Sequence, residues 1–239
     1  MTNTQFVDIN EIRKIPVPLS TEDMRKYQAV AHLDVIDSIK EELDKRGIGI
    51  VKENYKLGRF GQQLYGNFLT DMSVDPDMNS AIHFTNSYDK TKRLEIKSGC
   101  LVLVCSNGML RLSESSSSSR KHVGAISIEL ASMIDEAMDN MEIEYKMLVE
   151  AKNYLKQIEV HMRRRAEIAG RLFMEKQILS VTQMSVFKSE FERATNPFND
   201  DSAWTMYMNA TQALKLSHPV SYISDHQKLH QFAMEEFQL

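Results

Sequence analysis

The first strong pattern in the chain is a set of apolar residues spaced three or four positions apart from Leu33 onward. This spacing, with Gly47 as the stop signal, predicts an amphipathic helix over 33–46. The preceding residues, 1–31, are interpreted as an N-terminal arm, because two prolines interrupt regular structure there.

Between residues 48 and 112 the period of the pattern becomes that of β-strands. Four short segments rich in β-branched and aromatic residues are separated by turn sequences at 58–61 and 75–77 and by a lysine- and arginine-rich stretch. We predict a four-stranded antiparallel meander. The apolar run 100–105 does not alternate, which indicates a central strand covered on both faces.

A helical pattern returns after residue 123 and continues without proline to Asn196. It predicts one long helix, or two nearly continuous ones. Glu144 and Arg165 interrupt the second apolar seam, which favours a helix packed on another surface over a free coiled coil. The apolar residues that recur every seven positions are Ile134, Met141, Leu148, Leu155 and Met162.

The segment ATNPFNDD breaks the helical pattern, and two shorter helical stretches follow it. We therefore divide the chain into the arm 1–31, an α+β core with the long helix over 32–195, and a helical C-terminal tail over 196–239. The fold class is α+β: an N-terminal helix, a four-stranded antiparallel meander, a long packed helix and a helical C-terminal tail, because the strands are grouped together.

The overall charge argues against nonspecific binding to polyanions. The formal net charge is −4, so contact with nucleic acid requires a local basic patch. No apolar run reaches the roughly 18 residues of a membrane span, and the start of the chain lacks the apolar centre of a signal peptide. We expect a cytoplasmic protein without a membrane partner.

Motifs typical of enzymes are absent from the sequence. There is no Gly-rich phosphate loop, nucleophile elbow or zinc-protease motif, so we expect neither catalysis nor a cofactor. His226 and His230 have the spacing of half a zinc site, but nothing nearby completes it, and a polar helix surface is the simpler interpretation. Asp75 and Asp77 are interpreted as turn residues, and Cys100 as a buried thiol.

Basic residues are clustered despite the acidic total. Two groups flank the last strand of the meander and could converge on one rim of the sheet, where they would follow a phosphate backbone. Phe60, Tyr65 and Tyr88 are available to stack on bases. A solvated rim that only maintains solubility is the alternative. The predicted nucleic-acid-binding residues are Lys90, Lys92, Arg93, Arg111, Arg120, Lys121 and His122, with Tyr88 as the stacking residue.

Five serines, 115–119, stand immediately before the second basic group. Serines bury no apolar surface, so this segment can act as a spacer that lets Arg120, Lys121 and His122 reach a ligand. A helix beginning near Gly124 would add its free amides and partial positive charge, which suits an anion. A plain hairpin tip is the alternative interpretation.

Several blocks resemble one known family in the same order along the chain. They are Tyr55–Leu57 with the glycine-containing turn after it, His83–Lys90, Cys105–Met109, Arg120–Gly124 and Ala203–Thr211. The family is that of the phage/plasmid-like proteins, a domain-of-unknown-function family found in phages, plasmids and prophage islands. The resemblance extends over most of residues 30–215.

Two positions depart from the family pattern. Tyr88 stands where the family has histidine, which argues against a proton-transfer role there, and the five serines replace a longer basic connection. The resemblance implies work on phage or plasmid DNA, or interference with host defence, in the host cytoplasm. The order helix, antiparallel meander, helix is also similar to the core of single-strand annealing recombinases, a likeness of fold alone.

Two functions from different classes follow. The first is a non-enzymatic DNA-binding protein that binds or anneals single-stranded DNA as a homo-oligomer. The second is a protein-interaction module, an inhibitor of host defence or a structural component, whose Met-rich long helix contacts a host protein or a second copy. Fifteen methionines suit such an adaptable surface. Ile134, Met141, Leu148, Leu155 and Met162 would form that interface.

Overall fold

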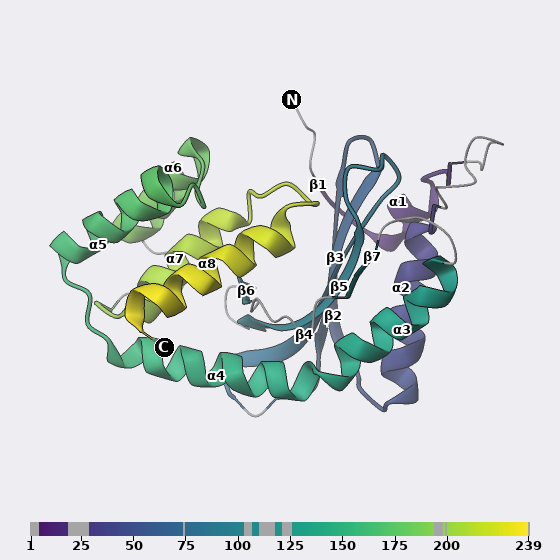
Figure 1. The fold of residues 1–239 in the computed structure, drawn as a ribbon, viewed down its shortest axis with the longest axis horizontal. Coiled ribbons are helices and arrows are strands. Elements are labelled where there is room, and N and C mark those ends of the chain that lie inside the picture. Colours follow the sequence, from purple (N-terminus) through teal and green to yellow (C-terminus); the bar gives the residue numbers. More distant parts are fainter. Residues whose placement is uncertain are drawn as a thin grey trace.

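An antiparallel sheet runs through the middle of the protein, with helices on both of its faces (Figure 1). The computed structural model describes residues 5–18, 29–73, 75–102, 107–109, 118–120, 126–193, 198 and 200–238. The strands between residues 50 and 120 follow one another without an intervening helix in the described residues, and helices precede and follow them, so the predicted α+β class is confirmed.

The predicted meander forms the body of the sheet. Each of its four long strands pairs antiparallel with the next, and three short strands extend the two edges within the described residues. The long strands are β2 (Ile50–Gly58), β3 (Gln63–Thr70), β4 (Met78–Ser87) and β5 (Leu94–Val102). The short strands are β1 (Gln5–Val7), which pairs with β2, and β6 (Asn107–Met109) and β7 (Ser118–Arg120), which both pair with β5.

Among the described residues, two helices lie between β1 and β2 in the chain, and the other helices follow β7. The predicted helix over 33–46 is confirmed as α2. The helices are α1 (Ile9–Arg13), α2 (His32–Lys45), α3 (Ile126–Asp139), α4 (Met141–Gln157), α5 (Met162–Gly170), α6 (Val181–Glu192), α7 (Ala203–Leu214) and α8 (Tyr222–Phe237), with a π-helical turn η2 (Arg171–Glu175) after α5. None of the helices in the described part of the chain has the length and apolar composition needed to cross a bilayer.

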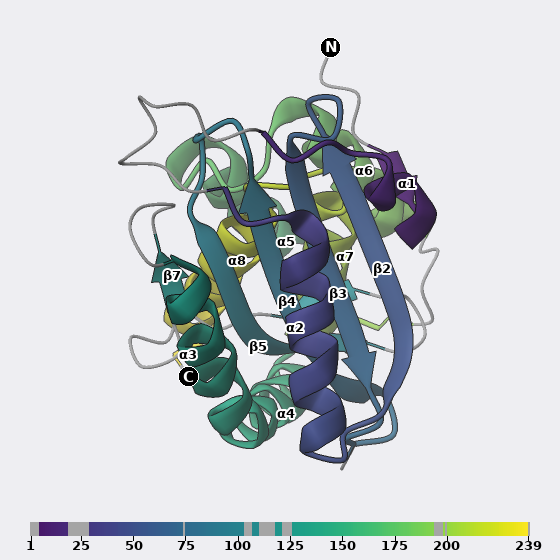
Figure 2. The same cartoon turned by 90° about the vertical axis from the view of Figure 1, so that its right-hand side faces the viewer.

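The first core lies between the sheet and the helices α2 and α3, which cross in front of it in Figure 2. Alternate residues of the long strands bury apolar side chains on this face, among them Phe68, Ile82 and Phe84. Gly66 is paired with Phe84, whose ring occupies the space that a β-carbon at position 66 would need. Only glycine therefore fits at this point of β3.

The second core is built around α7, the segment predicted to belong to a C-terminal tail. Every residue of α7 except Gln212 is buried, and Trp204 at its beginning has no exposed surface. Side chains of α4, α5, α6 and α8 pack around it. The C-terminal helices thus pack on their own chain and supply the centre of this core.

The region predicted to form one long helix, or two nearly continuous ones, contains the separate helices α3, α4, α5 and α6. The nearly continuous pair α3 and α4 ends at Gln157. Residues 158–160 are extended and bond to the start of α7: the Val160 amide donates to the Asp201 carbonyl at 2.7 Å, and the Ala203 amide donates to the Ile158 carbonyl at 2.8 Å. Arg165 donates from Nε to the Val160 carbonyl at 2.7 Å. These contacts between distant segments end the helix without proline or glycine.

Four of the five residues with heptad spacing are core residues. Ile134, Met141, Leu148 and Leu155 are buried against the sheet and the C-terminal helices, so the prediction that they form a partner interface is wrong. Their spacing reflects the burial of one face of α3 and α4 within the chain. Met162, in contrast, is 67% exposed.

A buried ion pair joins α4 to the turn between β3 and β4. Lys152 donates to both carboxylate oxygens of Asp75 at 2.6 Å, and to Asp77 at 3.1 Å. Lys156 also reaches Asp77, at 3.0 Å. The predicted turn is therefore confirmed, and its carboxylates neutralise lysines of α4.

Candidate nucleic-acid interface

Two turns of the meander protrude at the same end of the sheet, next to each other (Figure 2). The β2–β3 turn and the β4–β5 turn are joined by Asp89, which accepts hydrogen bonds from Arg59 at 3.0 Å and from Gln63 at 2.7 Å. The Tyr88 amide also donates to the Gln62 carbonyl at 2.7 Å. We call the surface formed by Arg59, Phe60, Lys90, Lys92 and Arg93 the basic rim.

The β2–β3 turn holds an aromatic ring away from the protein. Arg59, Phe60 and Gly61 have φ values of 47°, 56° and 87°, three consecutive residues in the left-handed region. Non-glycine residues adopt this conformation at a cost of roughly 1–2 kcal/mol each. The turn leaves the Phe60 side chain 97% exposed. Strained backbone conformations cluster at functional sites, so this turn is a candidate contact site.

The charge of the basic rim is positive. Arg59, Lys90, Lys92 and Arg93 are exposed, and Asp89 is the one carboxylate within the two turns. Partial burial opposes the ionisation of Asp89, but hydrogen bonds from Thr91 and the nearby Arg59 lower its pKa below the usual value. Asp89 therefore stays charged beside Arg59, while the side chains of Lys90, Lys92 and Arg93 add positive charge to the exposed surface of the rim.

The short strand β7 brings part of the second basic group to the rim. The Cα of Arg120 lies opposite Leu94 in the pairing of β7 with β5, one residue from Arg93. The main chain thus converges here as the sequence predicts. The Arg120 side chain and the residues Arg111, Lys121 and His122 lie outside the described part of the structure.

Tyr88 cannot stack on a base in this structure. The ring is buried and stacks on His32, with centroids 3.9 Å apart, and the His32 amide donates to its hydroxyl at 2.7 Å. Tyr65 is also buried, beneath Tyr222 of α8. Of the three aromatic residues predicted to be available for stacking, Phe60 is the exposed one, and its place at the tip of a tight glycine-flanked turn was the signal in the sequence.

The two histidines with metal-site spacing are not on the surface. His226 is buried and stacks on Tyr222 at 4.2 Å, and His230 is buried with its ring 6.1 Å from that of Tyr207. The predicted polar helix surface is therefore wrong, because this side of α8 covers the sheet. No cluster of three metal-ligating side chains occurs among the described residues.

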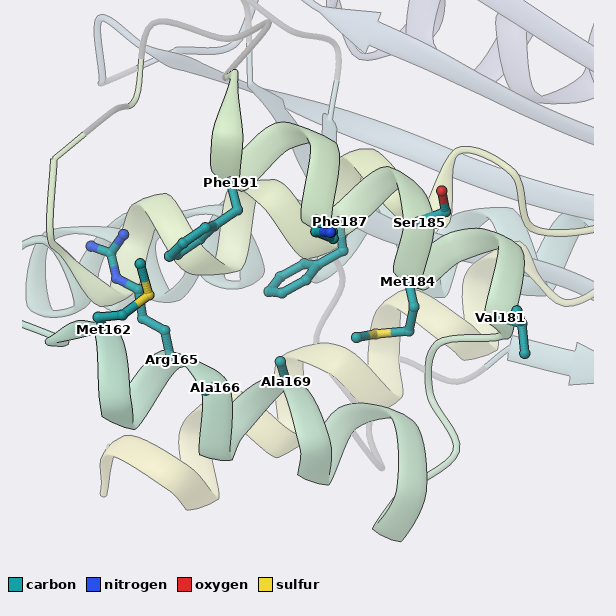
Figure 3. A pocket seen from close by; sticks show the side chains of 10 residues that line it. Met162, Arg165, Ala166, Ala169, Val181, Met184, Ser185, Phe187 and Phe191 are labelled. Atoms are coloured by element: carbon teal, nitrogen blue, oxygen red, sulfur yellow. The ribbon is translucent and has the colours of Figure 1, made fainter.

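A second surface feature is an apolar groove between α5 and α6 (Figure 3). Its volume is about 510 Å³. The rings of Phe187 and Phe191 on α6 lie across from Met162 and the alanines of α5. Arg165 borders the groove with its guanidinium 5.2 Å from the Phe191 ring.

The arginine cluster near this groove serves packing. Arg164 and Arg171 both bind the buried carboxylate of Glu236, and Arg165 pairs with Asp201 at 2.7 Å. These contacts hold α5 against α8 and the start of α7. Of the three consecutive arginines, Arg165 is buried, Arg164 is about half exposed and Arg163 is almost fully exposed.

Comparison with known proteins assigns the chain to a family without assigning an activity. Neither the curated proteins nor the solved structures that were compared contain a match. One family profile matches residues 23–229, which is most of the 239-residue chain and includes the basic rim and most residues of both cores. The protein therefore belongs to the family described as Domain of unknown function (DUF932).

Proposed function

We propose that the protein is a DNA-binding protein of phages or related mobile elements, which binds single-stranded DNA and anneals it as an oligomer without catalysing a reaction. The observation that carries this function is the basic rim, where exposed cations surround an almost fully exposed Phe60 ring. Lysine and arginine neutralise phosphates, and an aromatic ring stacks on any base.

The remaining support is topological. A helix followed by an antiparallel meander and further helices is the order found in the core of single-strand annealing recombinases, an analogy of fold alone. The two turns lie at the upper end of the sheet in Figure 2, so neighbouring subunits of an oligomer could align their rims along one strand. The net charge of −4 restricts DNA to this local patch.

The test is fluorescence anisotropy of a labelled single-stranded oligonucleotide at two salt concentrations, with duplex of the same sequence alongside. The triple variant Lys90→Gln, Lys92→Gln, Arg93→Gln should weaken binding by about tenfold or more and reduce its salt dependence. Phe60→Ala should weaken binding about 5- to 100-fold, the range for loss of one stacked base.

The matched control carries the same change of charge on exposed helical lysines: Lys45→Gln, Lys146→Gln, Lys188→Gln. It should bind as the unchanged protein does. Absence of binding at micromolar protein in low salt, or equal losses in the control and the rim variant, would reject the basic rim as a DNA site.

A second candidate function is protein interaction, favoured by the groove between α5 and α6. Met162 and Val181 are exposed at the groove, and methionine adapts to different apolar partners. In this function an inhibitor or structural component would hold an apolar segment of a host protein or of a second copy. Met162→Lys with Met184→Lys should then abolish capture of that partner while DNA binding persists, which separates the two functions.

A further inference from the structure

A second polar site lies on the face of the sheet that α8 covers, at the edge formed by β1, β2 and β3. A cavity of about 270 Å³ opens there, beside the connection between α7 and α8. Its lining combines three lysines, two asparagines and three aromatic rings. Such convergence of polar groups in a concave site is typical of a small-molecule pocket.

Lys56 is the buried cation of this pocket. Its side chain is 4% exposed, and Nζ donates to the carbonyls of Lys215 at 2.5 Å and of Ser217 at 3.1 Å. It forms no ion pair with a carboxylate in the described part of the chain. An ammonium group carries three N–H donors, so these two carbonyls leave one for a ligand. Burial lowers the pKa of Lys56 to about 8.

The charge around the cavity is one-sided. Lys52 and Lys215 line it together with Lys56, and the described lining contains no aspartate or glutamate. The nearest acidic residue in the sequence, Glu53, points to the opposite face of β2 and pairs with Lys40 at 2.7 Å. Burial of the Lys56 cation without a counter-charge is unfavourable, so an anion bound here would offset that cost, and the positive charges of Lys52 and Lys215 would attract the same anion.

Hydrogen bonds fix the asparagines of the pocket. Asn54 donates to Asn67 Oδ1 at 3.0 Å, Asn67 donates to the Tyr65 hydroxyl at 3.0 Å, and that hydroxyl lies 2.9 Å from His83 Nδ1. The Asn54 oxygen takes no part in this chain of bonds. An amide held in this way can recognise the edge of a base.

Aromatic rings form the apolar part of the lining. The Phe6 and Tyr222 rings lie 5.3 Å and 5.7 Å from Lys56 Nζ, so flat apolar surface adjoins the cation. Phe6 comes from β1, whose pairing with β2 closes the edge of the sheet beside the pocket. An inorganic anion would leave these rings unused, whereas a ligand with a flat ring and a phosphate uses both parts of the lining.

We propose that this pocket binds a nucleoside monophosphate, with its phosphate between Lys52, Lys56 and Lys215 and its base against Phe6 and Tyr222. The ligand is either a free mononucleotide or the 5′-phosphorylated end of a DNA strand, since both present the same chemistry. This site goes beyond the proposed DNA contact at the basic rim and does not depend on it, because the two share no residue.

The test is isothermal titration of the full chain at low salt with each deoxynucleoside monophosphate, with deoxyadenosine and with inorganic phosphate. One or more monophosphates should bind at least about tenfold tighter than either fragment. Lys56→Met and Lys52→Gln should each weaken that binding, by about tenfold or more and by about three- to tenfold, respectively. Lys40→Gln, on the other face, should not.

Lys52 is exposed, so Lys52→Gln tests the site even if Lys56→Met fails to fold. Three results would overturn the assignment: inorganic phosphate binds as tightly as the monophosphates, no monophosphate binds at millimolar concentration, or both Lys56→Met and Lys52→Gln bind the monophosphate as tightly as the unchanged protein does. Preference for a 5′-phosphorylated over a 5′-hydroxyl oligonucleotide identifies a strand end, and lack of preference a free nucleotide. The basic-rim triple variant should keep monophosphate binding, so failure of one site is distinguishable from failure of the other.

Discussion

The two faces of the sheet bury side chains of opposite character. The face beneath α2 and α3 buries apolar side chains, with Phe68, Ile82 and Phe84 at its centre. The other face, beneath α8, buries Lys56, Gln63, Tyr65, Asn67, His83 and Thr85. Polar groups at such cost are retained where they do more than pack, because an apolar side chain of similar size would be equally compatible with folding.

The largest effect should come from the apolar face. Phe84→Ala removes the ring that covers Gly66 and opens a cavity between α2 and the sheet, so the free energy of unfolding should fall by about 3–5 kcal/mol. Urea denaturation measures this loss. Phe60→Ala is the control, because that ring contacts solvent and its removal should change stability by less than about 0.5 kcal/mol.

Lys152 is a buried lysine that is paired with a carboxylate, in contrast to the buried Lys56. Lys152→Met leaves the buried carboxylate of Asp75 without its cation, and should cost about 3 kcal/mol by denaturation. The double variant with Asp75→Leu removes both charges and should recover much of this loss. No recovery would mean that Lys152 contributes chiefly through packing.

The polar face should make the protein sensitive to acid. Burial lowers the pKa of His83 to about 3, so between the ordinary histidine pKa of 6.5 and that value only the unfolded chain binds a proton. Stability should therefore fall as the pH falls, by about 2 kcal/mol between pH 6.5 and 5. Thermal denaturation across this range of pH should show a shallower dependence of stability on pH for His83→Gln than for the unchanged protein, and equal slopes would contradict this prediction.

Among the changes to buried side chains, the smallest effect on stability is expected at Lys56. Lys56→Met removes a buried cation, which favours folding, and two hydrogen bonds to carbonyls, which disfavours it. The two effects should cancel to within about 1 kcal/mol at neutral pH. Between pH 8 and about 10 the unfolded chain holds the lysine proton more tightly than the folded protein. Stability should rise more steeply with pH in the unchanged protein than in Lys56→Met, and equal slopes would contradict burial of this charge.

Local patterns predicted the elements, while contacts between distant segments decided their packing. The meander and α2 follow from their periods of two and 3.6 residues. The end of α4 at Gln157 could not be predicted, because it depends on bonds between 158–160 and the start of α7. Heptad spacing in α3 and α4 indicated a buried face correctly, but it does not specify whether the covering surface belongs to the same chain.

The candidate sites show the same division. Lys90, Lys92 and Arg93 are on the rim because a turn between two strands lies at the surface, where its charged side chains stay in water. Tyr88 adjoins them in sequence, yet its ring turns inward onto His32 of a helix far away in the chain. The pocket around Lys56 draws on β1, the meander and α8, so no local motif marks it.

The position of α7 after the sheet and α4 in the chain has a consequence for protein synthesis. The first core uses residues up to Met141, so it can assemble while the rest of the chain is still being translated. The second core needs Trp204 and the residues that surround it, which leave the ribosome after the residues of the first core. Until then the apolar side of α4, with Leu148 and Leu155, is exposed, and a nascent chain that stops before α7 becomes a substrate for chaperones and proteases.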